Sequence, residues 1–223
     1  SPERFRRVTP DRNPRQEVAS TSVSLLEEWC LNQDPVELDA PWESGTHGLQ
    51  PTPFYPALKN LIQAIGGRPK ITWLPVQPSL NACMLEGPGR DPVMLAWKND
   101  LDAPDEELTL PISSEQLHIH DVLGQPATGR PDRDQCHLFI HDLPIIISGF
   151  STTAPRLLSG LRLQPSSLPA ELKVHEHALT LHNNSASPLV GHLIAQTVDG
   201  VEIRPAIIGL DLAAGESLER PLE

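Results

Sequence analysis

The stretch from Thr46 to Trp97 constrains the fold most, because the spacing of its apolar residues changes at one pair of glycines, Gly66-Gly67. The residues before that pair predict an amphipathic helix, since apolar side chains recur at i, i+3, i+4 and i+7: Leu58, Leu61, Ile62 and Ile65. Pro53 and Pro56 suit the first turn of this helix, and the glycine pair suits a left-handed stop. Burying four such side chains would contribute about 1.5–3 kcal/mol each, so the helix needs a core to lie against.

From Ile71 onward, apolar and polar residues alternate with a period of two, which predicts β-structure. Turns rich in Gly, Pro and Asp separate the candidate strands. Strands of this length and spacing predict an antiparallel sandwich. We expect them at residues 71–76, 80–86, 92–98, 107–111, 116–122, 136–141 and 144–149.

A second series of strands follows a predicted linker at Ser151–Pro155. We expect these strands at residues 158–164, 170–182, 188–196, 201–208 and 216–220. Five strands are fewer than the seven of a complete immunoglobulin-like unit, so the pattern predicts an immunoglobulin-like β-domain and leaves its completeness open.

The N-terminal residues are the least regular part of the chain. Val18–Leu31 fits either a short helix or a strand that ends near Trp29, and Asn32–Gln50 predicts a loop. The 24 prolines suit a turn-rich β architecture. We therefore predict a mainly β protein with an α-containing N-terminal segment, an antiparallel β-sandwich and an immunoglobulin-like β-domain, at residues 1–67, 68–150 and 156–223.

Charge excludes one class of partner, because 29 acidic residues against 17 Lys and Arg give a net charge of −12. A nucleic-acid backbone would be repelled, so we expect no nucleic-acid partner. No run of eighteen apolar residues occurs, so no membrane-spanning helix is expected. Ser1–Arg15 holds five arginines without a following apolar segment and does not read as a signal peptide.

The cysteines do not form a recognisable site. Cys30, Cys83 and Cys136 are too few and too scattered for a disulfide framework or a zinc site. Three buried thiols are the favoured interpretation, and one disulfide remains an alternative. No motif for a phosphate loop or a nucleophilic serine is present, and no cofactor is expected.

Thr46–Gly67 resembles the last helix of the catalytic barrel in TIM-barrel glycoside hydrolases of the retaining clan A type. In that family a stretch of the form Gly-Leu, Pro-x-Pro-x-Tyr-x-Ala-Leu-x-x-Leu and Leu-Gly-Gly follows the final barrel strand. It stands here as Gly48-Leu49, Thr52–Leu61 and Ile65-Gly66-Gly67.

Two further parts of the chain carry a resemblance of the same kind. Three segments are similar to strands of the β-sandwich that packs beside that barrel: Val93–Trp97, Ile119–Gly124 and Leu143–Ile147. Residues 158–223 resemble the immunoglobulin-like modules appended to many secreted sugar enzymes.

The resemblance implies the non-catalytic C-terminal accessory region of a glycoside-hydrolase-like protein. Retaining glycosidases need two carboxyl groups about 5–5.5 Å apart. In this clan these groups belong to earlier barrel strands, and no segment here matches them. We therefore expect a fragment without hydrolase activity of its own, an upstream barrel domain as intramolecular partner, a polysaccharide or glycan reached through that domain, and an extracytoplasmic or secreted location.

A second hypothesis is an independent extracellular or cell-surface β-sandwich interaction module without enzymatic activity. The two hypotheses differ in what they predict for the helix before Gly66. If a barrel is missing, apolar surface should be exposed over Leu58–Ile65, whereas an independent module should cover it.

Trp29 and Trp42 are the candidate sugar-binding residues. If Ser22–Trp29 were the last barrel strand, the Trp29 indole would stack on a sugar ring. The favoured alternative places Trp29 on a helix face in the core with Leu25 and Leu26. Trp42, in a proline-bounded loop, either lines a cleft or anchors the loop. Beyond Trp97 the only aromatic residues are Phe139, expected in the core, and Phe150, which disfavours sugar stacking there.

The nine histidines offer one candidate metal site. His118 and His120 alternate along one predicted strand and would therefore share a face, and His137 and His141 would join them if their strand were a neighbour. The favoured alternative turns all four histidines to solvent. Separately, Asn183-Asn184-Ser185 fits a glycosylation sequon, which matters only in a eukaryotic secretory setting.

Overall fold

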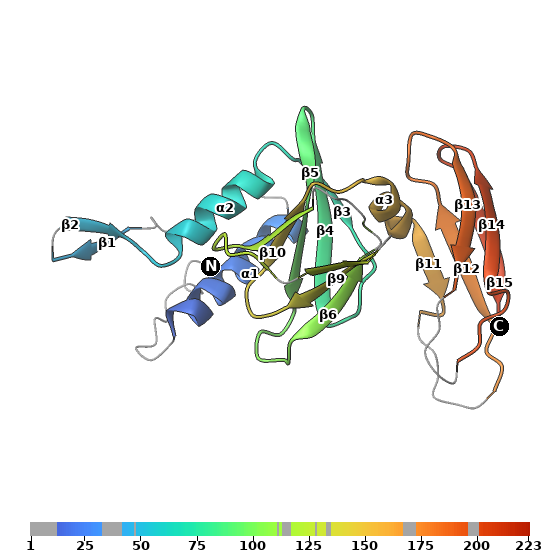
Figure 1. Cartoon of the computed structure of the whole chain (residues 1–223), viewed down its shortest axis with the longest axis horizontal. Helices are drawn as coiled ribbons and strands as arrows, with labels where there is room; N and C mark the ends of the chain where they lie inside the picture. The colour runs from blue at the N-terminus through green and yellow to red at the C-terminus, as the bar shows by residue number, and fades with distance from the viewer. Residues whose placement is uncertain are drawn as a thin grey trace. The chain divides into compact units, whose positions relative to one another are not determined.

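The computed structural model describes residues 13–32, 42–46, 48–110, 112, 117–127, 129–132, 135–166, 173–195 and 201–223. It is mainly β, with antiparallel sheets and a short helical N-terminal part, which confirms the predicted fold class (Figure 1). The chain forms two compact units, Ser1–Phe150 and Ser151–Glu223, which we call unit 1 and unit 2. The three-part division at residues 67/68 and 150/156 stays a prediction.

Unit 1 is built on a five-stranded antiparallel sheet that serves as a middle layer. Its strands follow the order β3-β4-β5-β10-β7. Their bounds are Lys70–Trp73 (β3), Leu80–Gly87 (β4), Arg90–Lys98 (β5), Ile145–Ser148 (β10) and His118–Asp121 (β7). One face packs on a three-stranded sheet of order β6-β9-β8, formed by Glu106–Leu110, Gly129–Asp132 (β8) and Gln135–Ile140 (β9).

The other face of the five-stranded sheet is covered by two helices, α1 (Pro14–Asn32) and α2 (Tyr55–Ile65) (Figure 1). Both faces of the central strands are therefore dry. On β4, Cys83 and Leu85 face the helices, whereas Ala82 and Met84 face the second sheet. The expected alternation with a period of two therefore does not hold for β4 and β5, which are nearly continuous apolar runs because both of their faces are covered.

The segment Val18–Leu31, which the sequence left open between helix and strand, lies in the helix α1. The predicted helix before the glycine pair is confirmed as α2. It ends at Ile65, and Gly67 supplies the positive φ of +73° that the stop requires. The buried guanidinium of Arg68 then donates to the carbonyl oxygens of Gln63 and Ala64, the unpaired acceptors of the last turn.

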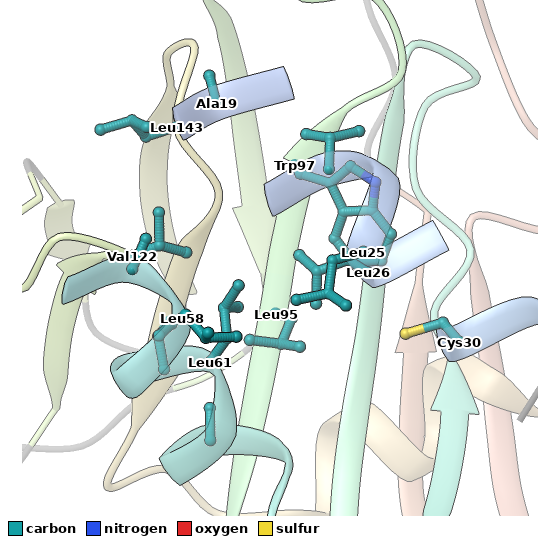
Figure 2. Close-up of a cluster of buried hydrophobic side chains, with 14 of the residues drawn as sticks. Ala19, Leu25, Leu26, Cys30, Leu58, Leu61, Leu95, Trp97, Val122 and Leu143 are labelled. Atoms are coloured by element: carbon teal, nitrogen blue, oxygen red, sulfur yellow. The ribbon is translucent and has the colours of Figure 1, made fainter. Parts of the chain in front are cut away.

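The apolar face of α2 is covered within unit 1. Leu58 and Leu61 are buried together with Leu95 of β5 and residues of α1, as Figure 2 shows. The exposed apolar surface expected over Leu58–Ile65 for a missing barrel is therefore not found on this face. Only Ile62, on the outer side of the helix, is strongly exposed.

Several short elements differ from the sequence prediction. The expected loop 32–50 contains a hairpin of β1 (Trp42–Gly45) and β2 (Gly48–Pro51), and the expected turn before Cys136 contains β8. The expected linker after Ser151 instead starts the helix α3 (Thr153–Ser159). Phe139 is not in the core: it is half-buried on β9, where it alternates with the fully buried Leu138 and Ile140.

Unit 2 is thinner than unit 1. One sheet has the order β11-β12-β15, from Leu161–Gln164, His177–His182 and Ser217–Leu222. The other pairs β13 (Leu189–Ile194) with β14 (Ile207–Leu212). Its core holds five buried apolar side chains: Leu179, Leu181, Ile208, Leu210 and Leu212.

Candidate functional site

An exposed aromatic pair marks the junction between the β1–β2 hairpin and α2. Trp42 begins β1, Tyr55 begins α2, and their ring centroids lie 5.2 Å apart at an interplanar angle of 47°. The two residues are 46% and 36% exposed. A tilted pair at this distance is a favourable aromatic geometry. The pair therefore holds two apolar rings together in solvent.

Two aliphatic side chains extend this apolar surface. Leu49 of β2 pairs with Ser44, two residues after Trp42, so Leu49 and Trp42 lie on the same face of the hairpin. Ile62 is seven residues after Tyr55 and therefore lies on the same side of α2. Both are exposed, at 74% and 59%. We call Trp42, Leu49, Tyr55 and Ile62 the hairpin patch.

The polar residues next to the hairpin patch are exposed. Lys59 lies one turn after Tyr55 on α2 and is exposed, whereas Glu43 and Gln50 pair with each other on the face of the hairpin opposite Trp42 and Leu49. Apolar rings bordered by an ammonium group and a phenolic hydroxyl suit a ligand with one apolar and one hydroxylated side. The sequence signalled Trp42, but nothing in it signalled Tyr55 as the partner ring.

Trp29 does not belong to this surface. It lies on α1, half-buried against the cluster that contains Leu25 and Leu26. This is the helix-face alternative that the sequence favoured for Trp29. The structure therefore packs one candidate tryptophan against the core and places the other on an exposed surface.

The histidines are distributed over two different sheets. His118 and His120 lie on β7, whose neighbour is β10, whereas His137 lies on β9 between β6 and β8. The idea that His137 and His141 follow a neighbouring strand of β7 is therefore wrong. Within the described residues, no group of three or more His, Cys, Asp and Glu side chains could hold a metal ion.

Three of the four histidines of the predicted metal site have a hydrogen-bond partner. The Nδ1 atom of His120 lies 2.9 Å from the carbonyl oxygen of Asp121. His137 pairs with Glu107 at 3.0 Å, and His141 pairs with Asp105 at 2.7 Å. His137 and His141 are therefore held in surface pairs with carboxylates.

A concavity of about 230 Å³ lies where α1, β7 and the β9–β10 turn meet. It is lined by Arg15, Asp121, Gln125, Pro126, Ala127, His141, Leu143 and Ile145. Its charged groups stabilise the fold: Arg15 pairs with Asp142 at 3.1 Å, and one Asp121 oxygen accepts the amides of Leu123 and Gln125. These residues lie far apart in the sequence, so no local pattern predicts the concavity.

The glycosylation sequon is blocked by the fold. Asn183 is 2% exposed, and its Nδ2 donates to the carbonyl oxygens of Ser187, Leu212 and Ala213. An amide that is buried and fully bonded is not available to an attached glycan. Asn183 therefore has a structural role in unit 2.

No family model and no curated protein matches the chain. A solved structure of a family 39 glycoside hydrolase from the gut symbiont Bacteroides cellulosilyticus WH2 is similar to part of it, at 16% sequence identity and a TM-score of 0.35. The similarity covers 44% of this chain and 20% of that chain. The chain thus spans about a fifth of that structure, and a likeness of this size carries no conclusion about activity. None of the helices in the described residues has the length and apolar character needed to cross a membrane.

Proposed function

We propose that this chain is a non-catalytic accessory region of a glycoside-hydrolase-like protein, and that the hairpin patch is where it contacts carbohydrate. The exposed Trp42–Tyr55 pair is the observation that carries the proposal. It lies at the start of the same helix whose sequence resembles the end of a glycoside hydrolase barrel. The exposed aromatic pair and the sequence resemblance therefore occur in the same segment of the chain.

The chemistry of the hairpin patch suits a sugar ring. A pyranose presents C–H groups on its flat faces and hydroxyl groups around its edge. The indole of Trp42 can pack against the flat face, and the Tyr55 hydroxyl and the Lys59 ammonium can form hydrogen bonds with hydroxyl groups at the edge of the ring. Because the surface is open and small, we expect a weak interaction with a Kd in roughly the millimolar range. A polymer with many repeats would strengthen it through avidity.

The proposal places catalysis outside this chain. The resemblance assigns the acid and the nucleophile to earlier barrel strands, which have no counterpart here. The role of this region would be to hold an upstream barrel close to its polysaccharide. An extracytoplasmic or secreted location is part of the same proposal, because the polysaccharide that the barrel would act on lies outside the cytoplasm.

Binding to a panel of polysaccharides in affinity gels tests this proposal. We expect retardation of the wild-type chain by at least one plant or bacterial polysaccharide and loss of retardation in Trp42→Ala. Trp73→Ala is the matched control, because Trp73 is 38% exposed but contacts Trp97 instead of Tyr55. Equal retardation of the wild type and Trp42→Ala on every polysaccharide would contradict the proposal.

One observation favours the second candidate function, an independent interaction module. The apolar face of α2 is covered by α1 and the sheet, and Leu61 is fully buried, so the described core of unit 1 does not require a barrel. An independent module predicts a monomer that binds a protein partner and no glycan. Sedimentation of the chain, alone and with the polysaccharide that retards it in the gel assay, separates the two functions. Co-sedimentation with the polysaccharide supports the first function, and a monomer that the polysaccharide leaves unchanged supports the second.

A further inference from the structure

We propose that Cys30 and Cys83 form a disulfide bond under oxidising conditions, which fastens α1 to the five-stranded sheet. The two Sγ atoms lie 3.9 Å apart, although the residues are 53 positions apart in the sequence. Cys30 belongs to the last turn of α1, and Cys83 to the helix-facing side of β4. Figure 2 shows Cys30 at the end of α1 with its sulfur directed toward the strands.

The distance and the burial of the two thiols favour a disulfide between them over a catalytic role for either one. A disulfide bond is about 2.05 Å long, so the sulfur atoms need to approach by about 2 Å, which side-chain rotation and a small helix shift can provide. Both residues are buried, at 3% and 0% exposure, and among the described residues the groups that influence the Cys83 thiol include no cation that would activate it for catalysis. The hydrogen bond to Cys30 and burial together raise the pKa of the Cys83 thiol, which keeps it unreactive in the folded state.

The bond therefore has to form while α1 is open, during folding or a transient release of the helix. With a low-molecular-weight disulfide as oxidant, the Cys30 thiolate attacks one oxidant sulfur and releases one thiol. The Cys83 thiolate then attacks the Cys30 sulfur of the mixed disulfide and releases the second thiol. Two protein thiols lose two electrons and two protons in total, and one oxidant disulfide is reduced to two thiols.

The consequence concerns the helical layer of unit 1. The α1–α2 layer is joined to the sheet mainly by side-chain packing in one cluster. A crosslink closing a loop of 53 residues lowers the entropy of the unfolded chain considerably. We expect the oxidised protein to unfold at a temperature about 5–10 °C above the reduced protein.

Oxidative refolding of the full chain with reduced and oxidised glutathione, followed by non-reducing peptide mapping, tests the proposal. We expect a peptide pair joined through Cys30 and Cys83, about 2 Da lighter than the two thiol peptides, together with the rise in melting temperature. Cys136→Ser is the matched control, because Cys136 lies in the other core cluster of unit 1, and this variant should keep the crosslink.

Two readouts keep the test independent of whether single variants fold. Reduction of the oxidised wild type should lower its melting temperature, whereas the Cys30→Ser/Cys83→Ser double variant, treated in the same way, should show no response to reductant. The proposal is overturned if the wild type keeps three alkylatable thiols after oxidation, if a crosslink includes Cys136, or if Cys30 and Cys83 carry only glutathione adducts.

Discussion

Units 1 and 2 are both antiparallel β-structures, yet they bury their residues very differently. Unit 1 places a five-stranded sheet between two helices and a second sheet, so that β4 and β5 are dry on both faces. Unit 2 has two small sheets around five buried apolar residues. Its pair β13–β14 leaves Val190, Ile194 and Ile207 largely exposed, at 75%, 63% and 59%.

This difference shows that a third layer changes which residues a sheet can hold on its outer face. Once helices cover the outer face, every position of a central strand can be apolar, and the unit has two cores that share one sheet. Without that cover, alternate residues must face water, and polar contacts take over part of the stabilisation. Four substitutions sharpen or break this comparison, and they follow from the largest expected effect to the smallest.

The largest effect is expected for Leu61→Ala in unit 1. Leu61 is fully buried between α2 and the sheet, so its loss leaves a cavity in a large core cluster and should lower the free energy of unfolding by about 3–5 kcal/mol. Denaturant unfolding with hydrogen exchange of peptides from residues 13–150 measures the change. Ile62→Ala, one residue away and exposed, should cost less than about 0.5 kcal/mol. Equal losses in the two variants would contradict the three-layer description.

A smaller effect is expected for Leu181→Ala in unit 2. Leu181 is 1% exposed, but its cluster is small and can relax around the missing side chain, so we expect a loss of about 2–3 kcal/mol. Hydrogen exchange should accelerate only in peptides of residues 151–223, because every member of the cluster belongs to unit 2. Acceleration in peptides of unit 1 would show that the core of unit 2 is not separate from the cores of unit 1.

Asn183→Ala tests the polar part of unit 2. The substitution leaves three carbonyl oxygens without their amide donor, which should lower the free energy of unfolding by about 2 kcal/mol. Asn184→Ala is the control, since Asn184 is exposed and its amide donates to the Ser159 hydroxyl. Thermal unfolding compares the two variants, and a neutral Asn183→Ala would refute the structural role of this side chain.

The smallest effect is expected for Gly215→Ala. Gly215 has φ of +76° and open space around its Cα, so an added methyl group causes backbone strain alone, worth about 1 kcal/mol. Gly191→Ala on β13 also meets open space but lacks the positive φ, and should be neutral or slightly stabilising. If the free energies of unfolding of these two variants differ by less than about 0.3 kcal/mol in denaturant unfolding, backbone strain at Gly215 does not contribute to the stability of unit 2.

The sequence predicted the elements that have a clear period or a continuous apolar run, and missed those that have neither. The spacing of Leu58 and Leu61 indicated α2, and the apolar runs around Cys83 and Leu95 indicated β4 and β5. The β1–β2 hairpin was missed because residues 42–51 show no alternation, and β8 was missed because Gly-Arg-Pro-Asp reads as a turn.

The candidate sites followed the same rule. Trp42 was visible as a rare aromatic residue, but its contact with Tyr55 depends on how the hairpin meets α2. The proximity of Cys30 and Cys83 depends on α1 crossing the sheet, which no local pattern encodes. The error about His137 came from strand order, because β9 belongs to a different sheet from β7.

The most direct test of the glycan-contact proposal is calorimetric titration of the chain with oligosaccharides of the best-retained polysaccharide, with reducing ends counted in the same samples. We expect saturable binding by the wild type and by Trp73→Ala, at least tenfold weaker binding by Trp42→Ala, and no release of reducing ends. Unchanged binding by Trp42→Ala would remove the hairpin patch as the contact surface, and release of reducing ends would contradict a non-catalytic role.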